Sequence, residues 1–395
     1  MVTTALLLMA LLQPTYCELI FVLALWTTGE RGLNEAPYPN DLNDPDDWSR
    51  GEGLLTEIGL KRMFELGKWL RQRYMIDTPL LSKTYSIHEL VVQSASAPHT
   101  IESAQAVVAG LYPDEGNGKW SNYSLGSWQP TPVFTAQPWT PDPHLLQPSY
   151  PCPAYHQLID EENKNYYERF DKESKEWYKV LERHTGIIPV NRVAIFKLHG
   201  IHHEITHGQP QPDWINEVHN GTTAVEWLRD AHRELAHALF NSKSKARLTA
   251  GVLLNDWIEA LIGISHHTLE ARRAIFSSSG IPSMLAMRYA MGIADQEAPG
   301  YGSLLLVELH RPNGWNLFVK LYTRNSTGHL FQHKLPDCEH NCPLDRFISE
   351  LRPMRLTVQD FELMCTSDPR SSSYDGRAAL TMITFLTTLI TVNYM

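Results

Sequence analysis

Apolar residues along the chain alternate between short continuous runs and helical stripes. The run at 18–26 is almost wholly apolar, which is typical of a strand buried on both faces of a sheet. The segment 54–74 repeats apolar residues every three or four positions, which predicts an amphipathic helix. Its stripe comprises Leu60, Met63, Leu66 and Leu70. The same alternation predicts strands at 88–96, 272–280, 303–310 and 315–323 and helices at 100–113, 251–263 and 283–292.

The order of these elements predicts an α/β fold, a mostly parallel sheet with helices on both faces. Two helical stretches, 160–186 and 224–240, interrupt the alternation and predict a helical cap region inserted into the α/β domain. A connection rich in Pro, Trp and Gly, at 115–153, leads into it. The expected divisions are a first α/β part at 18–150, the cap region at 151–247 and a second α/β part at 248–370.

Both ends of the chain carry apolar segments outside this pattern. The run at 5–12 is followed by Gln and Pro, which predicts a secretory signal peptide at 1–17 with cleavage after Cys17. The segment 371–395 begins with small polar residues and ends in an apolar tail, as a GPI-anchor signal does. A transmembrane anchor and a free tail are the alternatives, and we expect membrane attachment.

The charge of the chain excludes one class of partner. It has 34 Lys and Arg against 44 Asp and Glu, a net charge of −10, and no basic cluster, so nucleic-acid binding is not expected. We expect no metal or other cofactor. The expected partner is a small polar ligand or a protein, with a second copy of the chain in a homodimer as one case.

Cysteines and glycosylation sequences agree with the secretory pathway. Removal of the signal peptide leaves four of the five cysteines, which allow three disulfide pairings. These cysteines are Cys152, Cys338, Cys342 and Cys365. Acceptor triplets for N-glycosylation begin at Asn122, Asn220 and Asn325. We therefore expect a glycoprotein that is extracellular, on the cell surface or in the lysosomal lumen.

Several segments, taken in order, resemble one known family. The stretch ELIFVLALWTTGERG, 18–32, is similar to the first strand and Arg-His-Gly-x-Arg loop of the histidine acid phosphatases, the prostatic and lysosomal enzymes in particular. Further similar segments are 54–74, 110–116, 128–135, 251–257 and 338–347. The last is the most distinctive, with Cys-x-x-x-Cys before Pro-Leu-Asp-Arg-Phe. The resemblance implies the disulfides Cys338–Cys342 and Cys152–Cys365, with Leu304 in place of half of a third one.

The resemblance also implies phosphohistidine chemistry, for which this chain has lost residues. In the family a neutral imidazole attacks phosphorus, arginines clamp the phosphoryl oxygens, and a His-Asp pair protonates the leaving alcohol. Matched position by position, the first arginine of the loop is Thr27 and the nucleophilic histidine is Thr28. The second arginine of the loop is retained as Arg31.

The remaining matched positions are replaced as well. The third clamp arginine, after the second strand, falls on Gln93, and the His-Asp pair falls on Ser279 and Gly280. A threonine hydroxyl is a poor nucleophile without an activating base. We therefore expect a pseudophosphatase that acts by binding, with these residues lining its ligand site or an unused cleft. The alternative is an acid phosphomonoesterase with residual activity.

One motif favours a third function. His203-Glu204-x-x-His207 is the zincin pattern, and Glu226 follows at a spacing that resembles a third ligand, so a zinc hydrolase is a further alternative. Glycine and prolines directly after His207 would end the helix, and we interpret these histidines as solvated or locally packed. We interpret four other histidines, His232, His237, His266 and His267, as ordinary helix residues.

Overall fold

A computed structural model gives the three-dimensional structure of the chain. It describes residues 17–44, 46, 48–113, 130–136, 142, 144, 146–147, 152–269, 271–312 and 316–366. Residues 1–16 of the expected signal peptide, Asn122 and the expected C-terminal anchor at 371–395 lie outside the described residues, so these predictions stay predictions.

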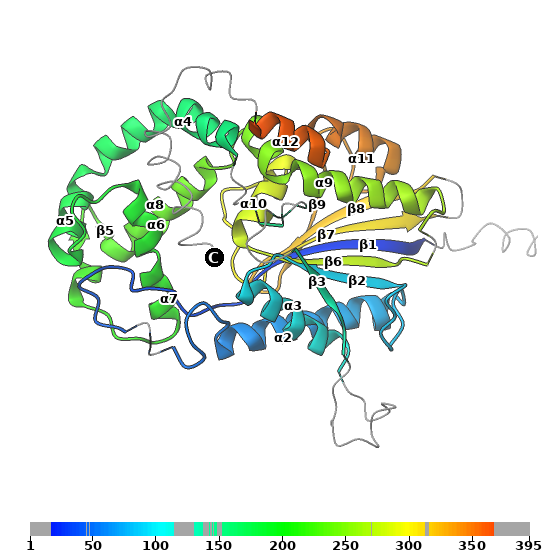
Figure 1. Cartoon of the computed structure of the whole chain (residues 1–395), viewed down its shortest axis with the longest axis horizontal. Helices are drawn as coiled ribbons and strands as arrows, with labels where there is room; N and C mark the ends of the chain where they lie inside the picture. The colour runs from blue at the N-terminus through cyan, green and yellow to red at the C-terminus, as the bar shows by residue number, and fades with distance from the viewer. Residues whose placement is uncertain are drawn as a thin grey trace, which may run out of the picture.

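One mixed sheet forms the centre of the molecule (Figure 1). β1 (Glu18–Thr27) lies in the middle of the order β10-β8-β7-β1-β6-β2-β3, and β9 pairs with β8. The other strands are β2 (Leu90–Ser94), β3 (Val133–Thr135), β6 (Ala274–Ser279), β7 (Leu304–Arg311), β8 (Phe318–Arg324), β9 (Leu330–His333) and β10 (Cys342–Pro343). β1, β6, β2, β3 and β8 run in one direction and β7, β9 and β10 in the other, which confirms the α/β prediction.

Helices cover both faces of the sheet, and this explains why β1 is apolar throughout. On one face α2 (Glu57–Arg71) and α3 (Pro98–Leu111) pack against every second residue of β1, such as Ala24 and Trp26. On the other face α9 (Lys243–Ser265) and α10 (Ile281–Ala290) pack against the alternate residues, such as Leu23 and Leu25. Side chains of a strand alternate between faces, so both sets must be apolar.

The cap region is a separate layer of helices beyond the carboxyl end of β1 (Figure 1). It comprises α4 (Pro153–Glu173), α5 (Lys175–Thr185), α6 (Arg192–Leu198), α7 (Gly200–Thr206), α8 (Ala224–Ala238), the 3-10 turn η3 (Asp213–Asn216) and the hairpin β4 (Val218–His219) and β5 (Thr222–Thr223). These helices have their own apolar core, in which Leu181, Ile195 and Leu228 are fully buried. The cap helices therefore pack on one another and face the end of the sheet.

Two disulfides stabilise this arrangement, one between distant parts of the chain and one within a short loop. Cys152, before α4, is bonded to Cys365 in α12 (Val358–Thr366), and Cys338 is bonded to Cys342 ahead of α11 (Leu344–Leu351). Both pairings implied by the family resemblance are confirmed. Among the described helices, α9 alone is long and apolar enough to cross a membrane, and 67% of that stretch is buried in the core.

A glycine in the first turn of α2 positions the loop after β1. A Cβ atom added to Gly59 would lie 2.1 Å from the carbonyl oxygen of Glu30. The same carbonyl accepts the backbone N–H of Thr56, the residue that caps α2, at 2.9 Å. Only a glycine lets the helix approach the loop this closely.

We expect Gly59→Ala to lower the free energy of unfolding by about 1–3 kcal/mol, because the added methyl must push the loop backbone away. Urea denaturation of this variant and of Lys61→Ala, an exposed position on the same helix, measures the effect. Equal free energies of unfolding for the two variants would show that the loop can move away from the added methyl group without loss of stability.

Candidate functional site

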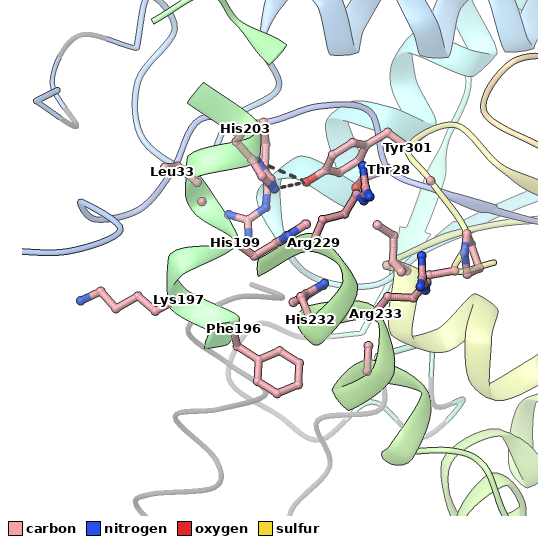
Figure 2. A pocket seen from close by; sticks show the side chains of 18 of the residues that line it. Thr28, Leu33, Phe196, Lys197, His199, His203, Arg229, His232, Arg233 and Tyr301 are labelled. Atoms are coloured by element: carbon pink, nitrogen blue, oxygen red, sulfur yellow. Dashed lines mark hydrogen bonds between the residues drawn. The ribbon is translucent and has the colours of Figure 1, made fainter. Parts of the chain in front are cut away.

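A cavity of about 300 Å³ lies between the carboxyl end of the sheet and the cap helices. Its lining comes from the loop after β1, the first turn of α3, the start of α10, the 297–301 segment, and α6, α7 and α8 (Figure 2). In open α/β sheets this edge of the sheet, where strands end, is the usual place of a ligand site.

Of two successive threonine side chains where β1 runs into its loop, one lines the cavity and the other is turned away from it. Thr28 lines the cavity, whereas the Thr27 hydroxyl donates to the carbonyl oxygen of Gly300 at 2.7 Å and is fully buried. The Glu30 carboxylate binds Arg62 of α2, with an oxygen-to-nitrogen distance of 2.6 Å, and does not line the cavity. Thr27 therefore holds the loop in place, and Thr28 is the residue that a ligand would meet.

Arg31 and His99 are the two buried titratable groups at the cavity floor, which we define as Thr28, Arg31, His99 and Gly280. These residues are 6% and 3% exposed. Burial, and secondly the charge of Arg31, lower the pKa of His99 to about 3. Burial also lowers the pKa of Arg31, but a guanidinium stays charged in proteins. The floor thus presents one cation and one neutral imidazole.

The assignment of the third clamp position to Gln93 is corrected. Gln93 lies within β2, where its amide donates to the hydroxyl of Ser277 at 2.9 Å, and it does not line the cavity. The residue after the second strand that reaches the cavity is His99, in the first turn of α3. The physical reason is that residues 95–97 carry the chain around the end of the sheet before a side chain can point into the cavity.

Ser279 and Gly280 lie at the end of β6, beside the loop after β1. Ser279 pairs in register with Thr27, which agrees with the expectation that the two loops meet at one edge of the sheet. The Ser279 hydroxyl is fully buried and donates to the carbonyl oxygen of Leu146, so it is turned away from the cavity. Gly280 lines the cavity without a side chain. Of the predicted residues, Thr28, Arg31 and Gly280 therefore share the cavity.

Five aromatic rings form a continuous wall on the cap side of the cavity, which we call the ring wall (Figure 2). Its members in order of contact are Phe196, His232, His199, His203 and Tyr301. The imidazoles of His199 and His232 are stacked, with ring centroids 3.7 Å apart, and the Tyr301 hydroxyl is hydrogen-bonded to Nε2 of His203 at 2.7 Å. α6, α7, α8 and the 297–301 segment each contribute to this wall.

Burial favours the neutral form of the four titratable rings in the ring wall. Burial lowers the pKa of His203 and of His232 to about 3 and that of His199 well below its ordinary value. Burial raises the pKa of Tyr301 to about 12. His232, which we interpreted as an ordinary helix residue, lies in α8 as expected, and its ring is stacked on that of His199 at the cavity.

The rim of the cavity bears charges that are mostly paired. Arg229 and Arg233 of α8, which we call the rim arginines, share the carboxylate of Asp230 at 3.2 and 3.1 Å. Lys197 binds Glu35 at 2.9 Å. These groups are partly exposed to solvent, which weakens their attraction for a ligand.

The side chains of the zincin-like motif point to different places. His203 faces Tyr301, whereas His207 is hydrogen-bonded to the Thr56 hydroxyl at 2.9 Å. Glu226 closes a capping box at the start of α8, where it accepts hydrogen bonds from Thr223. Within the part of the chain that the structure describes, no group of three or more histidines, cysteines or carboxylates is arranged to hold a metal ion.

Glu204, the remaining residue of that motif, is a buried carboxyl group. Burial first, and then the carboxylate of Asp41, raise its pKa from the usual 4.5 to about 7, although Gln211 donates to its Oε2 at 2.8 Å and Asn43 also stabilises the anion. A carboxyl group with a raised pKa binds its proton more tightly in the folded chain than in the unfolded chain. The free energy of unfolding should therefore increase as the pH falls from about 7 to about 4.5.

We expect Glu204→Gln to remove this part of the pH dependence, so that the variant gains stability relative to wild type at pH 7.5 but not at pH 5.0. Melting temperatures of both proteins at the two pH values measure it, with Glu52→Gln, an exposed position, as the control. If Glu204→Gln and the control respond to pH alike, Glu204 is ionised in the folded chain throughout this range.

Comparison with known proteins identifies the family to which this chain belongs. The sequence model of the histidine phosphatase superfamily (branch 2) matches residues 23–322. The lysosomal acid phosphatase of Bos taurus is 30% identical over 85% of this chain and 77% of its own length, and the testicular acid phosphatase of Homo sapiens is 31% identical over 85% and 80%. A Hafnia alvei phytase solved with myo-inositol hexakis sulphate shares the fold, with a TM-score of 0.65 over 88% of this chain and all of that one, at 14% identity. The chain belongs to the histidine phosphatase superfamily, branch 2.

Proposed function

We propose that this acid phosphatase-like protein is a pseudophosphatase, which binds a ligand in the cavity and does not hydrolyse phosphomonoesters by the phosphohistidine route of its family. The observation that carries this proposal is the nature of the cavity floor, where Thr28 stands in the place of the nucleophile. An alcohol needs a base to become an effective nucleophile. Within the described residues, the Thr28 hydroxyl has no hydrogen bond to a histidine or a carboxylate, and Glu30 is bound to Arg62.

The means to protonate a leaving alcohol are also missing at the matched positions. The Ser279 hydroxyl is committed to the carbonyl of Leu146, and Gly280 has no side chain. With Thr27 and His99 in place of two clamp arginines, the site lacks two charge-assisted contacts of about 1.5–3 kcal/mol each. This corresponds to two to four decades in affinity for a phosphate dianion.

One observation favours residual phosphomonoesterase activity as the second function. His99 is a neutral imidazole at the cavity floor beside Arg31, and a neutral imidazole is the form that attacks phosphorus. If the wild-type protein turns over a phosphate ester, His99 is the residue with which the search for the nucleophile begins.

The secretory pathway is the compartment that suits this fold. The relatives are lysosomal, prostatic and testicular acid phosphatases, and the two disulfides need an oxidising environment to form. Asn220 is exposed in the turn between β4 and β5, where a glycan would meet solvent. Membrane attachment by the C-terminal tail remains part of the proposal.

The experiment that tests the proposed function is hydrolysis of a generic aryl phosphate at acid pH by purified wild type, Arg31→Ala and His99→Ala. We expect no rate above background from any of them. A wild-type rate of ordinary enzymatic size that Arg31→Ala abolishes would contradict the proposal. Loss of that rate in His99→Ala as well would establish the second function.

A further inference from the structure

A second cavity, of about 380 Å³, shares one wall with the first, and its volume is in the range of small-molecule sites. The segment 297–300 lines both cavities. The rest of the second lining comes from α10, the start of β7, the end of β8 and from β9. The proposed function gives this second cavity no ligand.

The predicted glycan acceptor Asn325 lies at the second cavity. It follows β8 directly and lines the cavity together with Ser326, the second residue of the acceptor triplet. Its Oδ1 accepts hydrogen bonds from the hydroxyl of Thr327 and from the backbone N–H of His329, both at 2.9 Å. Within the described residues its Nδ2, the atom that carries an N-linked glycan, makes no hydrogen bond. The side chain is thus held by its oxygen, and its nitrogen is free to bear a sugar.

An exposed aromatic ring lies on the same face of the sheet as this acceptor. Phe331 of β9 pairs with Thr323 of β8, and Thr323 is two residues before Asn325. Directly opposed residues, and residues two apart along a strand, have side chains on the same face. All three residues line the cavity, and Phe331 is 50% exposed. An aromatic ring of this kind offers a flat apolar surface on which the C–H face of a sugar can pack.

Two buried N–H groups of the cavity lining lack acceptors. Arg288 is 7% exposed and binds Asp295 through Nη2, and the guanidinium of Arg324 lies 5.1 Å from the ring centroid of Trp69. Within the described residues the Nε of each arginine is buried without a hydrogen-bond partner, which is unusual for a buried donor. The hydroxyl and acetamide oxygens of a sugar are neutral acceptors. They would satisfy both groups without adding a charge to the cavity.

We propose that an N-linked glycan on Asn325 folds back onto the second cavity, with its first sugar packed against the ring of Phe331 and its oxygens hydrogen-bonded to the arginines of the lining. The ligand is therefore the core of the glycan, which begins with N-acetylglucosamine. Covalent attachment beside the cavity gives the sugar a high effective concentration there, so weak contacts are enough to hold it. The inference goes beyond the proposed function and rests on the predicted glycosylation of Asn325.

The test compares how fast a peptide N-glycosidase releases the glycans of Asn325 and Asn220 from the folded protein. The full chain is purified from eukaryotic secretory cells, and mass spectrometry follows the occupancy of each site over time. Asn220 is exposed in a turn and lines neither cavity, so its glycan is the internal control. We expect release at Asn325 to be at least about tenfold slower than at Asn220 in the folded protein, because packing hides the bond to the sugar. After denaturation the two rates should be equal.

Two variants of β9 separate the ring contact from the rest of the strand. Phe331→Ala should bring the release rate at Asn325 to within about twofold of the rate at Asn220. Leu330→Ala is the matched control, since this neighbouring residue is 38% exposed and does not line the cavity. It should leave the protection of Asn325 unchanged. An unaltered release rate at Asn220 in both variants excludes a general loss of structure.

Melting temperatures measure the same contact independently. Asn325→Gln removes the glycan and should lower the melting temperature by about 2–4 °C. In the Phe331→Ala background the same change should have little effect, because the sugar has already lost the ring on which it packs. Asn220→Gln removes a glycan from an exposed turn and should leave the melting temperature unchanged.

The outcomes that would overturn the inference are specific to it. They include equal release from the two sites of the folded protein, and an Asn325 that carries no glycan. Protection of Asn325 that survives Phe331→Ala would show that the ring does not hold the sugar. An equal thermal loss from Asn325→Gln with and without the ring would assign that loss to the hydrogen bonds of the Asn325 oxygen. None of these measurements involves phosphatase activity, so they fail or succeed separately from the proposed function.

Discussion

Thr28→His alone will leave the protein without measurable phosphomonoesterase activity, whereas a fivefold variant will gain turnover. The five changes are Thr27→Arg, Thr28→His, His99→Arg, Ser279→His and Gly280→Asp. The single change restores a nucleophile, but the phosphate would still meet Arg31 as the one cation of the floor. Its leaving alcohol would still lack an acid, and general acid catalysis contributes about 10²–10⁴-fold. Residues that act as a unit are strongly non-additive, so one repair should gain little.

The position of the third clamp residue provides a matched control. The control variant carries the same four changes with Gln93→Arg in place of His99→Arg. Gln93 lies within β2 and bonds to Ser277, so an arginine there would not reach the cavity floor. We expect the control to be at least about tenfold less active than the fivefold variant, since one charge-assisted clamp contact is worth about 1.5–3 kcal/mol.

Hydrolysis of an aryl phosphate by wild type, the single variant, the fivefold variant and the control measures all of these effects. Activity in Thr28→His comparable to that of the fivefold variant would mean that Arg31 and the neutral His99 suffice as a clamp. Greater activity in the control than in the fivefold variant would mean that the floor is not where phosphate binds. Melting temperatures of all four proteins exclude misfolding as the cause of a negative result.

The sequence predicted the α/β part of the fold because its signals are local. The continuous apolar run at 18–26 became β1, and the stripe with Met63, Leu66 and Leu70 became the buried side of α2. The end of that helix was less accurate: the α-helix ends at Arg71, and a π-helical turn, η2 (Gln72–Asp77), continues beyond the predicted end at 74.

The candidate site was predicted in part, for a physical reason. Thr28 and Gly280 follow β1 and β6 directly, so parallel pairing of these strands brings them to one edge of the sheet, and Arg31 lies in the same loop as Thr28. His99 lies a turn further on, and its placement depends on how the chain rounds the end of β2. The ring wall depends on packing between cap helices, which no periodicity within one helix reveals. The spacing of His199 and His203, four residues apart, was the one signal in the sequence that they share a helix face.

The second prediction with a large expected effect concerns the bond between Cys152 and Cys365. This disulfide closes a loop with a sequence separation of 213 residues and ties the start of the cap region to the last described helix. In the chain-entropy model, a loop of this length restricts the unfolded chain enough to contribute about 5 kcal/mol to the free energy of unfolding. The Cys338–Cys342 bond closes a loop with a separation of 4, for which the same model gives about 2 kcal/mol.

We therefore expect Cys152→Ala/Cys365→Ala to lower the melting temperature by about 10 °C, more than twice the loss in Cys338→Ala/Cys342→Ala. Both sulfur pairs are buried, so the alanine pairs leave comparable cavities and the contrast isolates loop length. Thermal and urea denaturation of the two variants and wild type provide the comparison. An equal loss in both variants would show that the long bond stabilises the protein by packing in the core that α4 and α12 share. A larger loss from the short bond would show that the loop at 338–342 holds α11 in place more strongly than the long bond holds the cap region.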